Sequence, residues 1–194
     1  MLTLSPIDLR YDIPMPSWHG HNQVFWRLKN ASPYLQIDLA VIKHSNNNKF
    51  LEPELHGNLV VHFDKCSVVQ QLPLDQENLR NVLSSRIQSL KKMFDMFQVM
   101  TEKEINRGNA VEAISYYQGL TLRPLVEALR IKYRPEQYNY HTRYIYYDLP
   151  REIVDKLETF YFIKNLAELR LRRQEAEELF WETIASLDGK LQSM

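Results

Sequence analysis

The spacing of apolar residues divides the chain near Pro73. Before this point, short runs rich in Val, Ile, Phe, Tyr and Trp are separated by Pro, Gly and Asn clusters, a pattern typical of strands and turns. The predicted turns are Asn30–Pro33 and Asp64–Cys66. The predicted strands are Leu9–Ile13, Gln23–Lys29, Tyr34–Lys43, Asn58–Phe63 and Ser67–Gln70.

After Pro73 the apolar residues follow a helical period. One face of a long helix is predicted from residues three or four apart, namely Leu79, Leu83, Ile87, Leu90, Phe94 and Phe97. Asp75 is its predicted N-cap and Gly108 its predicted end. Further helices are predicted over 109–133 with a break or kink at Pro124, over 150–162 starting at Pro150, and over 166–187.

These elements predict an α+β fold. A strand-rich domain over residues 1–72 precedes a helical bundle over residues 73–194. A domain as short as the first buries a small fraction of its surface and is marginal on its own. We therefore expect it to be stabilised by the helices or by a segment outside this sequence.

Charge and cysteine content narrow the classes of function. The chain has 24 Lys and Arg residues against 24 Asp and Glu residues, so no net field attracts nucleic acid or an anionic membrane. Cys66 is the single cysteine, which excludes an intrachain disulfide and fits a reducing compartment. Because we identify neither a signal peptide nor a run of about 20 apolar residues, the predicted protein is soluble and cytoplasmic.

Asp38 lies within the mostly apolar run Tyr34–Ile42. Alternation along a strand places it on the face of Gln36 and Ala40, whereas Ile37, Leu39 and Val41 are predicted to point into a core. A carboxylate in such a strand is costly unless it is paired or binds a cation. Asp38 is therefore either a metal ligand or a hydrogen-bonded structural residue.

Three other groups of residues suggest a site. His19 and His21 have a spacing that metals use, but no further ligands are suitably spaced, and an ordered loop is the alternative. The tyrosines and arginines over 123–147 could stack bases and hold phosphates, or could anchor a helix connection. Glu112, Tyr116 and Arg123 share a predicted helix face with Gly119, which could border a pocket or be an ordinary charged face.

The order of these features resembles the nucleotidyltransferases of the lincosamide- and aminoglycoside-modifying kind, over roughly residues 20–185. An apolar strand with one aspartate, Asp38, precedes a predicted hairpin over 56–64 and then a helical bundle. The segments Leu122–Tyr133, Arg143–Tyr144 and Asp148–Pro150 resemble the helical C-terminal half of these proteins.

The resemblance implies transfer of a nucleoside monophosphate from a nucleoside triphosphate to a hydroxyl of a small acceptor. It places Asp38 at the third carboxylate that binds Mg²⁺, which prefers hard oxygen ligands. The helix faces alone, without a family motif, suggest Glu112 or Glu127 as general base. On the same basis, Tyr116 and Arg123 are expected to line the acceptor pocket.

The sequence departs from this family ahead of Asp38. Residues 1–33 contain no Gly-Ser element followed by an Asp-x-Asp or Asp-x-Glu pair. The chain is then either a shortened form of a longer protein, which the presence of Asp38 favours, or a degenerate relative without transfer activity. We expect the isolated chain to be inactive, and to use Mg²⁺ only if the two other carboxylates are supplied.

Two further functions remain as alternatives. The first is a non-catalytic helical protein that binds a partner or forms a homodimer. The second is a nucleic-acid-binding module that uses the tyrosines and arginines over 123–147. The zero net charge disfavours the second alternative, because phosphate contacts need a positive surface.

Overall fold

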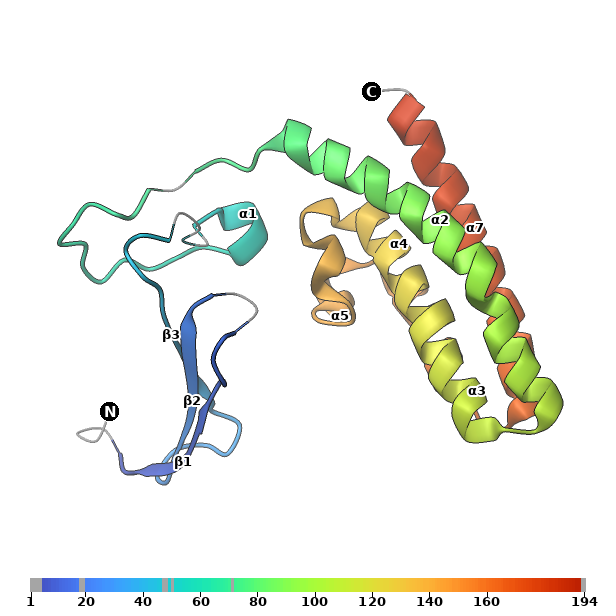
Figure 1. Cartoon of the computed structure of the whole chain (residues 1–194), viewed down its shortest axis with the longest axis horizontal. Coiled ribbons are helices and arrows are strands. Elements are labelled where there is room, and N and C mark those ends of the chain that lie inside the picture. The colour runs from blue at the N-terminus through green and yellow to red at the C-terminus, as the bar shows by residue number, and fades with distance from the viewer. Residues whose placement is uncertain (1–4, 18–19, 47–48, 50, 71, 193–194) are drawn as a thin grey trace. The chain divides into compact units, whose positions relative to one another are not determined.

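The computed structural model describes residues 5–17, 20–46, 49, 51–70 and 72–192, and the side chains of this set up to residue 188. The fold is α+β, as predicted, with the strands first and the helices after them (Figure 1). Two compact units are present. The sheet unit falls within residues 1–51 and 59–71, and the helical unit comprises residues 52–58 together with those from 72 onward.

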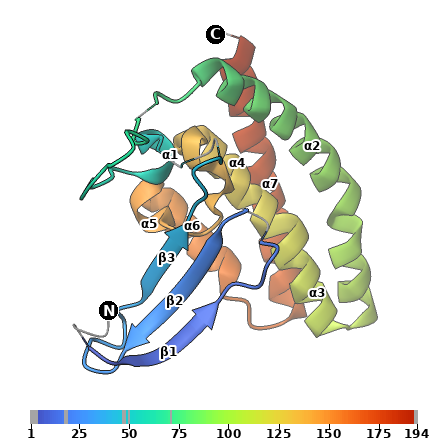
Figure 2. The same cartoon turned by 60° about the vertical axis from the view of Figure 1, so that its left-hand side comes forward.

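The sheet unit is built on three antiparallel strands in the order β1-β2-β3 (Figure 2). Their bounds are Ile7–Asp12, Asn22–Leu28 and Ile37–Val41, which confirms the first three predicted strands and the turn before β3. The register sets Phe25 opposite both Tyr11 and Asp38. Opposite residues in neighbouring strands lie on the same face, so Asp38 shares its face with two aromatic rings.

The strands bury little of their apolar surface. Leu28 is the single fully buried residue of the three strands. Leu39 and Val41 are 42% and 59% exposed, so the sheet unit itself does not supply the core into which they were predicted to point. The physical reason is that its described strands form one sheet layer, and a single layer buries apolar residues only where a second layer packs on it.

The predicted strands Asn58–Phe63 and Ser67–Gln70 are absent from the structure, and with them the hairpin over 56–64. The Asp64 carboxylate instead accepts hydrogen bonds from the backbone N–H groups of Cys66, Val68 and Val69 at 3.0–3.3 Å. These bonds lower the pKa of Asp64, and the bond from Val69 contributes most to this change. Backbone donors used in this way cannot form a β-ladder.

The helical unit contains three long or medium helices that pack side by side: α2 (Gln76–Arg107), α4 (Arg123–Tyr133) and α7 (Leu166–Gln192). Figure 1 shows α2 alongside α7. The other helical elements are α1 (Pro53–His56), α3 (Ala110–Tyr116), α5 (Ile145–Asp148), α6 (Arg151–Tyr161), the π-helix η1 (Tyr117–Leu122) and the 3₁₀-helix η2 (Pro135–Tyr140). None of the described helices is both long enough and apolar enough to cross a membrane.

The long helix α2 follows its sequence signals. Asp75 caps it by accepting a hydrogen bond from the Asn78 backbone N–H at 2.9 Å, and Gly108 ends it with a positive φ of 77°. Both predicted ends are therefore confirmed. Most of the predicted apolar face is buried, but Phe97 lies at its margin and is 42% exposed.

The predicted break at Pro124 is replaced by a π-helical turn. The Arg123 backbone N–H bonds to the carbonyl of Gln118, five residues earlier. Proline has no N–H and its ring clashes with the carbonyl four residues before it in an α-helix. The wider turn of η1 accommodates these constraints, so the chain stays helical from Ala110 to Tyr133.

Candidate functional site

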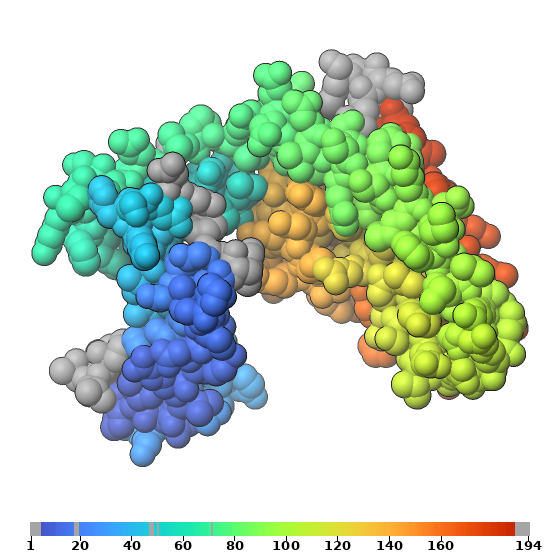
Figure 3. Space-filling view, viewed as in Figure 1, coloured from blue at the N-terminus to red at the C-terminus, as the bar shows by residue number. Residues whose placement is uncertain are grey.

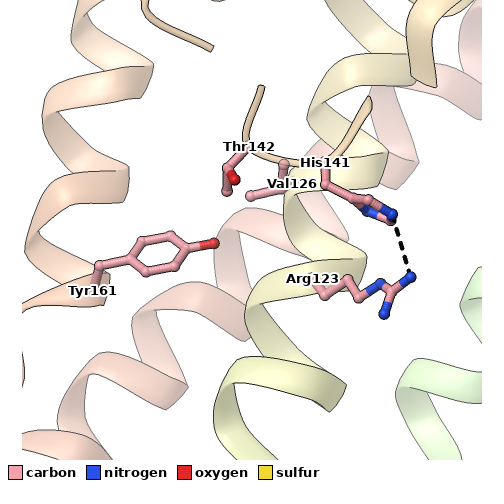
Figure 4. Close-up of a pocket in the computed structure, with 5 residues that line it drawn as sticks. All are labelled: Arg123, Val126, His141, Thr142 and Tyr161. Carbon is pink, nitrogen blue, oxygen red and sulfur yellow. Dashed lines mark hydrogen bonds between the residues drawn. The ribbon is translucent and has the colours of Figure 1, made fainter. Parts of the chain in front are cut away.

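A pocket of about 350 Å³ opens on the helical unit (Figure 4). Arg123 and Val126 come from α4, His141 and Thr142 from the connection that follows η2, and Tyr161 from the last turn of α6. This pocket brings together four polar side chains around one apolar residue. Arg123 is the only one of the five that the sequence singled out as a binding residue.

One hydrogen bond joins the side chains of Arg123 and His141 in this pocket. Arg123 Nη2 lies 3.2 Å from His141 Nε2. Because a guanidinium group only donates, Nε2 must accept, which places the proton of the neutral ring on Nδ1. On the other side of Val126 in Figure 4, the Tyr161 hydroxyl points into the pocket. Burial raises the pKa of Tyr161, so this hydroxyl keeps its proton and remains a donor.

The loop that carries His141 and Thr142 is held by the buried guanidinium of Arg130. Its Nε donates to the His141 carbonyl at 2.9 Å, and Nη2 donates to the Arg143 carbonyl at 2.5 Å. Nη1 and Nη2 both donate to Asp148 Oδ2 at 2.9 Å. Burial lowers the pKa of Arg130, and the Asp148 charge opposes this change.

Two residues of the same loop have backbone conformations that are rare for side chains other than glycine. The φ angles are 53° at His141 and 61° at Tyr144. Such conformations persist where the surroundings enforce them, and they are common at functional sites. Here Arg130 supplies the restraint through the carbonyls of residues 141 and 143.

Some tyrosines of this region form hydrogen bonds that hold the fold together, and others lie on its surface. The Tyr140 hydroxyl donates to the Leu55 carbonyl at 2.5 Å, which fastens α1 to η2, and the Tyr146 hydroxyl donates to Glu158 at 2.8 Å. Arg143 lies over the rings of Tyr140 and Tyr144. Figure 3 shows the 135–148 segment, in orange, on the surface of the helical unit.

A larger hollow of about 490 Å³ lies between α1, the start of α2 and η2. Leucines and tyrosines form much of its lining, and Glu52, Asp75 and Glu136 are its acidic residues. Asp75 caps α2, and Glu52 Oε2 lies 3.7 Å from His56 Nε2. Two of these three carboxylates thus have structural partners, so this hollow is a weaker candidate site.

Asp38 is exposed on β3, where its Oδ1 accepts a hydrogen bond from Gln23 Nε2 at 2.7 Å. Within the described part of the chain, no three His, Cys, Asp or Glu residues are grouped so that they could hold a metal ion. The residues present therefore supply one carboxylate and do not by themselves fit a magnesium site. Of the predicted histidine pair, His19 lies outside the described residues.

Glu127 is buried on α4 and forms a two-point ion pair with Arg86 of α2. Its Oε1 accepts from Nε at 2.5 Å and its Oε2 from Nη2 at 2.8 Å. The bond to Glu127 raises the pKa of Arg86. Because both carboxylate oxygens are engaged, the geometry favours a role in joining the two helices over a role as general base.

Glu112 and Tyr116 do not reach the pocket that contains Arg123. Glu112 is exposed in the first turn of α3 and makes no hydrogen bond or ion pair with a described residue, and Tyr116 is half-buried. The π-helical turn between Tyr116 and Arg123 changes the rotation along the helix. The common face that regular α-helical spacing predicts for these residues is thereby interrupted.

Glu127→Gln and Glu112→Gln form a matched pair that tests these assignments. We expect Glu127→Gln to lower the free energy of unfolding by about 1.5–3 kcal/mol, the range for a hydrogen bond to a charged group. Glu112→Gln is expected to change it by less than about 0.5 kcal/mol, as is usual for exposed positions. Urea unfolding followed by circular dichroism measures both values. Equal effects would contradict the structural role of Glu127.

His141, Thr142 and Tyr161 are the site residues that sequence reasoning did not find. The signal available for His141 was its position within the tyrosine- and arginine-rich stretch. Nothing in the spacing indicates that the end of α6 meets this loop. Comparisons of the chain with protein-family models, with curated proteins and with solved structures found no match.

Proposed function

We propose that this chain is a nucleotidyltransferase-like protein, and that the reaction is transfer of a nucleoside monophosphate from a nucleoside triphosphate to a hydroxyl of a small acceptor. The observation that carries the proposal is the state of the Asp38 carboxylate. In the same sheet, Asp8 pairs with Arg27 and Asp12 with Arg10, each at 2.7 Å. Asp38 has no Lys, Arg or His partner among the described residues and bonds only to the neutral amide of Gln23. An exposed carboxylate without a cationic partner is available to a bound cation.

In this proposal, Asp38 of the sheet unit contributes one carboxylate to the cation that accompanies the triphosphate. In the reaction, the acceptor oxygen forms a bond to the α-phosphorus, the bond to pyrophosphate breaks, and the hydroxyl proton passes to a base. Since Asp38 is a single ligand, we expect the isolated chain to bind the nucleotide weakly and not to complete the transfer.

Calorimetry with ATP and MgCl₂ tests the proposal. We expect the wild-type chain to bind ATP in the presence of Mg²⁺, and the Asp38→Asn variant to bind at least about tenfold more weakly, which corresponds to about 1.4 kcal/mol. The Asp12→Asn variant is the control, because Asp12 lies in the same sheet but is paired with Arg10. Equal affinities of the wild type and Asp38→Asn would contradict the proposal.

A non-catalytic interaction protein is the second candidate. The observation that favours it is a groove of about 460 Å³ on the sheet unit, to which Tyr11, Phe25 and Tyr34 contribute. Tyr34 is 95% exposed and Leu9 is 56% exposed, and exposed apolar surface of this kind often marks a binding surface. If no ATP binding is detected with either the wild type or Asp38→Asn, this second function is favoured.

A further inference from the structure

We propose that the pocket around Arg123 binds a small molecule through an oxyanion, either a phosphate or a carboxylate. The inference goes beyond the proposed function and does not depend on it, because every residue that lines the pocket belongs to the helical unit. Its test needs neither ATP nor magnesium.

The charge of Arg123 is the first observation. Most arginines of the helical unit lie within ion-pair distance of a carboxylate, namely Arg86, Arg107, Arg130, Arg134, Arg151, Arg170, Arg172 and Arg173. Arg123 has no such partner among the described residues, and its one hydrogen bond goes to the neutral ring nitrogen of His141. None of the described residues that line its pocket is acidic. The remaining N–H donors of Arg123 are therefore free to bind an oxyanion, for which the guanidinium group has a matching fork geometry.

Two unused hydroxyl groups are the second observation. The hydroxyls of Thr142 and Tyr161 line the same pocket, and neither forms a hydrogen bond with a described residue. Val126 lies between the Tyr161 side and the Arg123 side in Figure 4. This arrangement fits a ligand with an oxyanion at Arg123 and His141, a body across Val126, and oxygen atoms that accept from the two hydroxyls.

The prior ordering of the loop is the third observation. The buried Arg130 already holds the His141 backbone at a positive φ of 53°. A loop that is fixed before binding loses little conformational freedom when the ligand arrives. The volume of about 350 Å³ is at the lower end of the range for small-molecule sites, which favours a compact acid over a large ligand.

The experiment is a titration of the full ¹⁵N-labelled chain with inorganic phosphate, and separately with acetate, at constant ionic strength. We expect the backbone amide signals of residues 141 and 142 to shift with a saturable dependence on concentration. Saturation by phosphate alone assigns a phosphorylated ligand, saturation by acetate alone assigns a carboxylic acid, and saturation by both supports the shared oxyanion chemistry. Absence of a saturable shift with either anion would overturn the inference.

Variants separate a specific site from general charge effects. Arg123→Gln is expected to weaken binding at least about tenfold, and Tyr161→Phe to weaken it severalfold. Arg80→Gln is the matched control, because Arg80 also has no carboxylate partner among the described residues but lies outside the pocket. Equal losses in Arg80→Gln and Arg123→Gln would overturn the inference.

A further control distinguishes this inference from the proposed function. Asp38→Asn is expected to bind the anions with the same affinity as the wild type, since Asp38 is not among the residues that line the pocket. If the chain binds ATP but neither anion, the oxyanion site is rejected and the nucleotide proposal still stands. The reverse result would reject the nucleotide proposal alone. If Arg123→Gln does not fold, Thr142→Val and Tyr161→Phe provide the same comparison from the other side of the pocket.

Discussion

Replacement of Arg130 by methionine is expected to lower the free energy of unfolding by about 3–5 kcal/mol, the range for removing one partner of a buried ion pair. The Arg130 side chain is 0% exposed, and Asp148 is 12% exposed. The variant would leave the Asp148 carboxylate without its principal partner, and the carbonyls of His141 and Arg143 without their donor. Urea unfolding measured by circular dichroism gives the change.

Arg134→Met is the matched control for Arg130→Met. Arg134 Nε also approaches Asp148, at 3.7 Å, but its side chain is 46% exposed. Exposed ion pairs contribute about 0–1 kcal/mol, so the control is expected to change stability by no more than that. If Arg130→Met were as mild as Arg134→Met, Arg130 would not be the residue that holds this loop.

Replacement of Phe180 by alanine is expected to lower the free energy of unfolding by about 3–5 kcal/mol, the typical cost of removing a buried phenyl ring. Phe180 of α7 stacks on Phe94 of α2, with ring centroids 3.7 Å apart and planes 7° from parallel. Both rings are 0% exposed. The loss includes the transfer of the ring from water to the core and the cavity that remains.

Phe97→Ala is the control for Phe180→Ala. Phe97 is on α2, as Phe94 is, but it is 42% exposed and lies outside the buried core. We expect its replacement to cost less than half as much as that of Phe180, because it removes less buried area and leaves no enclosed cavity. Thermal unfolding should rank the two variants in the same order as urea. The opposite order would contradict the position of the α2–α7 contact.

The parts of the fold that were predicted correctly depend on local signals. Asp75, Gly108 and the apolar face of α2 lie within one segment, so the sequence contains everything that defines that helix. The three strands of the sheet were likewise flanked by strong turn residues. The strands predicted over 58–63 and 67–70 depend on pairing partners, which a period-two pattern cannot supply. The hydrogen bonds of Asp64 then gave the second of these segments a different local structure.

The candidate site was less predictable because it depends on contacts between distant segments. Arg123 was identified from its helix, but its partner His141 is 18 residues away. Arg130 and Asp148 are separated by the same number of residues, and their pairing determines the loop that carries His141. The π-helical turn before Arg123 also removed Tyr116 from the expected face. A regular helical period contains no sign of such a turn.

The availability of Asp38 to a cation is the central claim, and a residue-resolved metal titration tests it most directly. Mn²⁺ added with ATP broadens the NMR signals of nuclei near the bound ion. We predict selective broadening of the amide signals around Asp38 in β3 and around Gln23 in β2, which lies beside it, and loss of this effect in Asp38→Asn. Broadening centred on Asp8 or Asp12, or no difference between the wild type and Asp38→Asn, would contradict the claim.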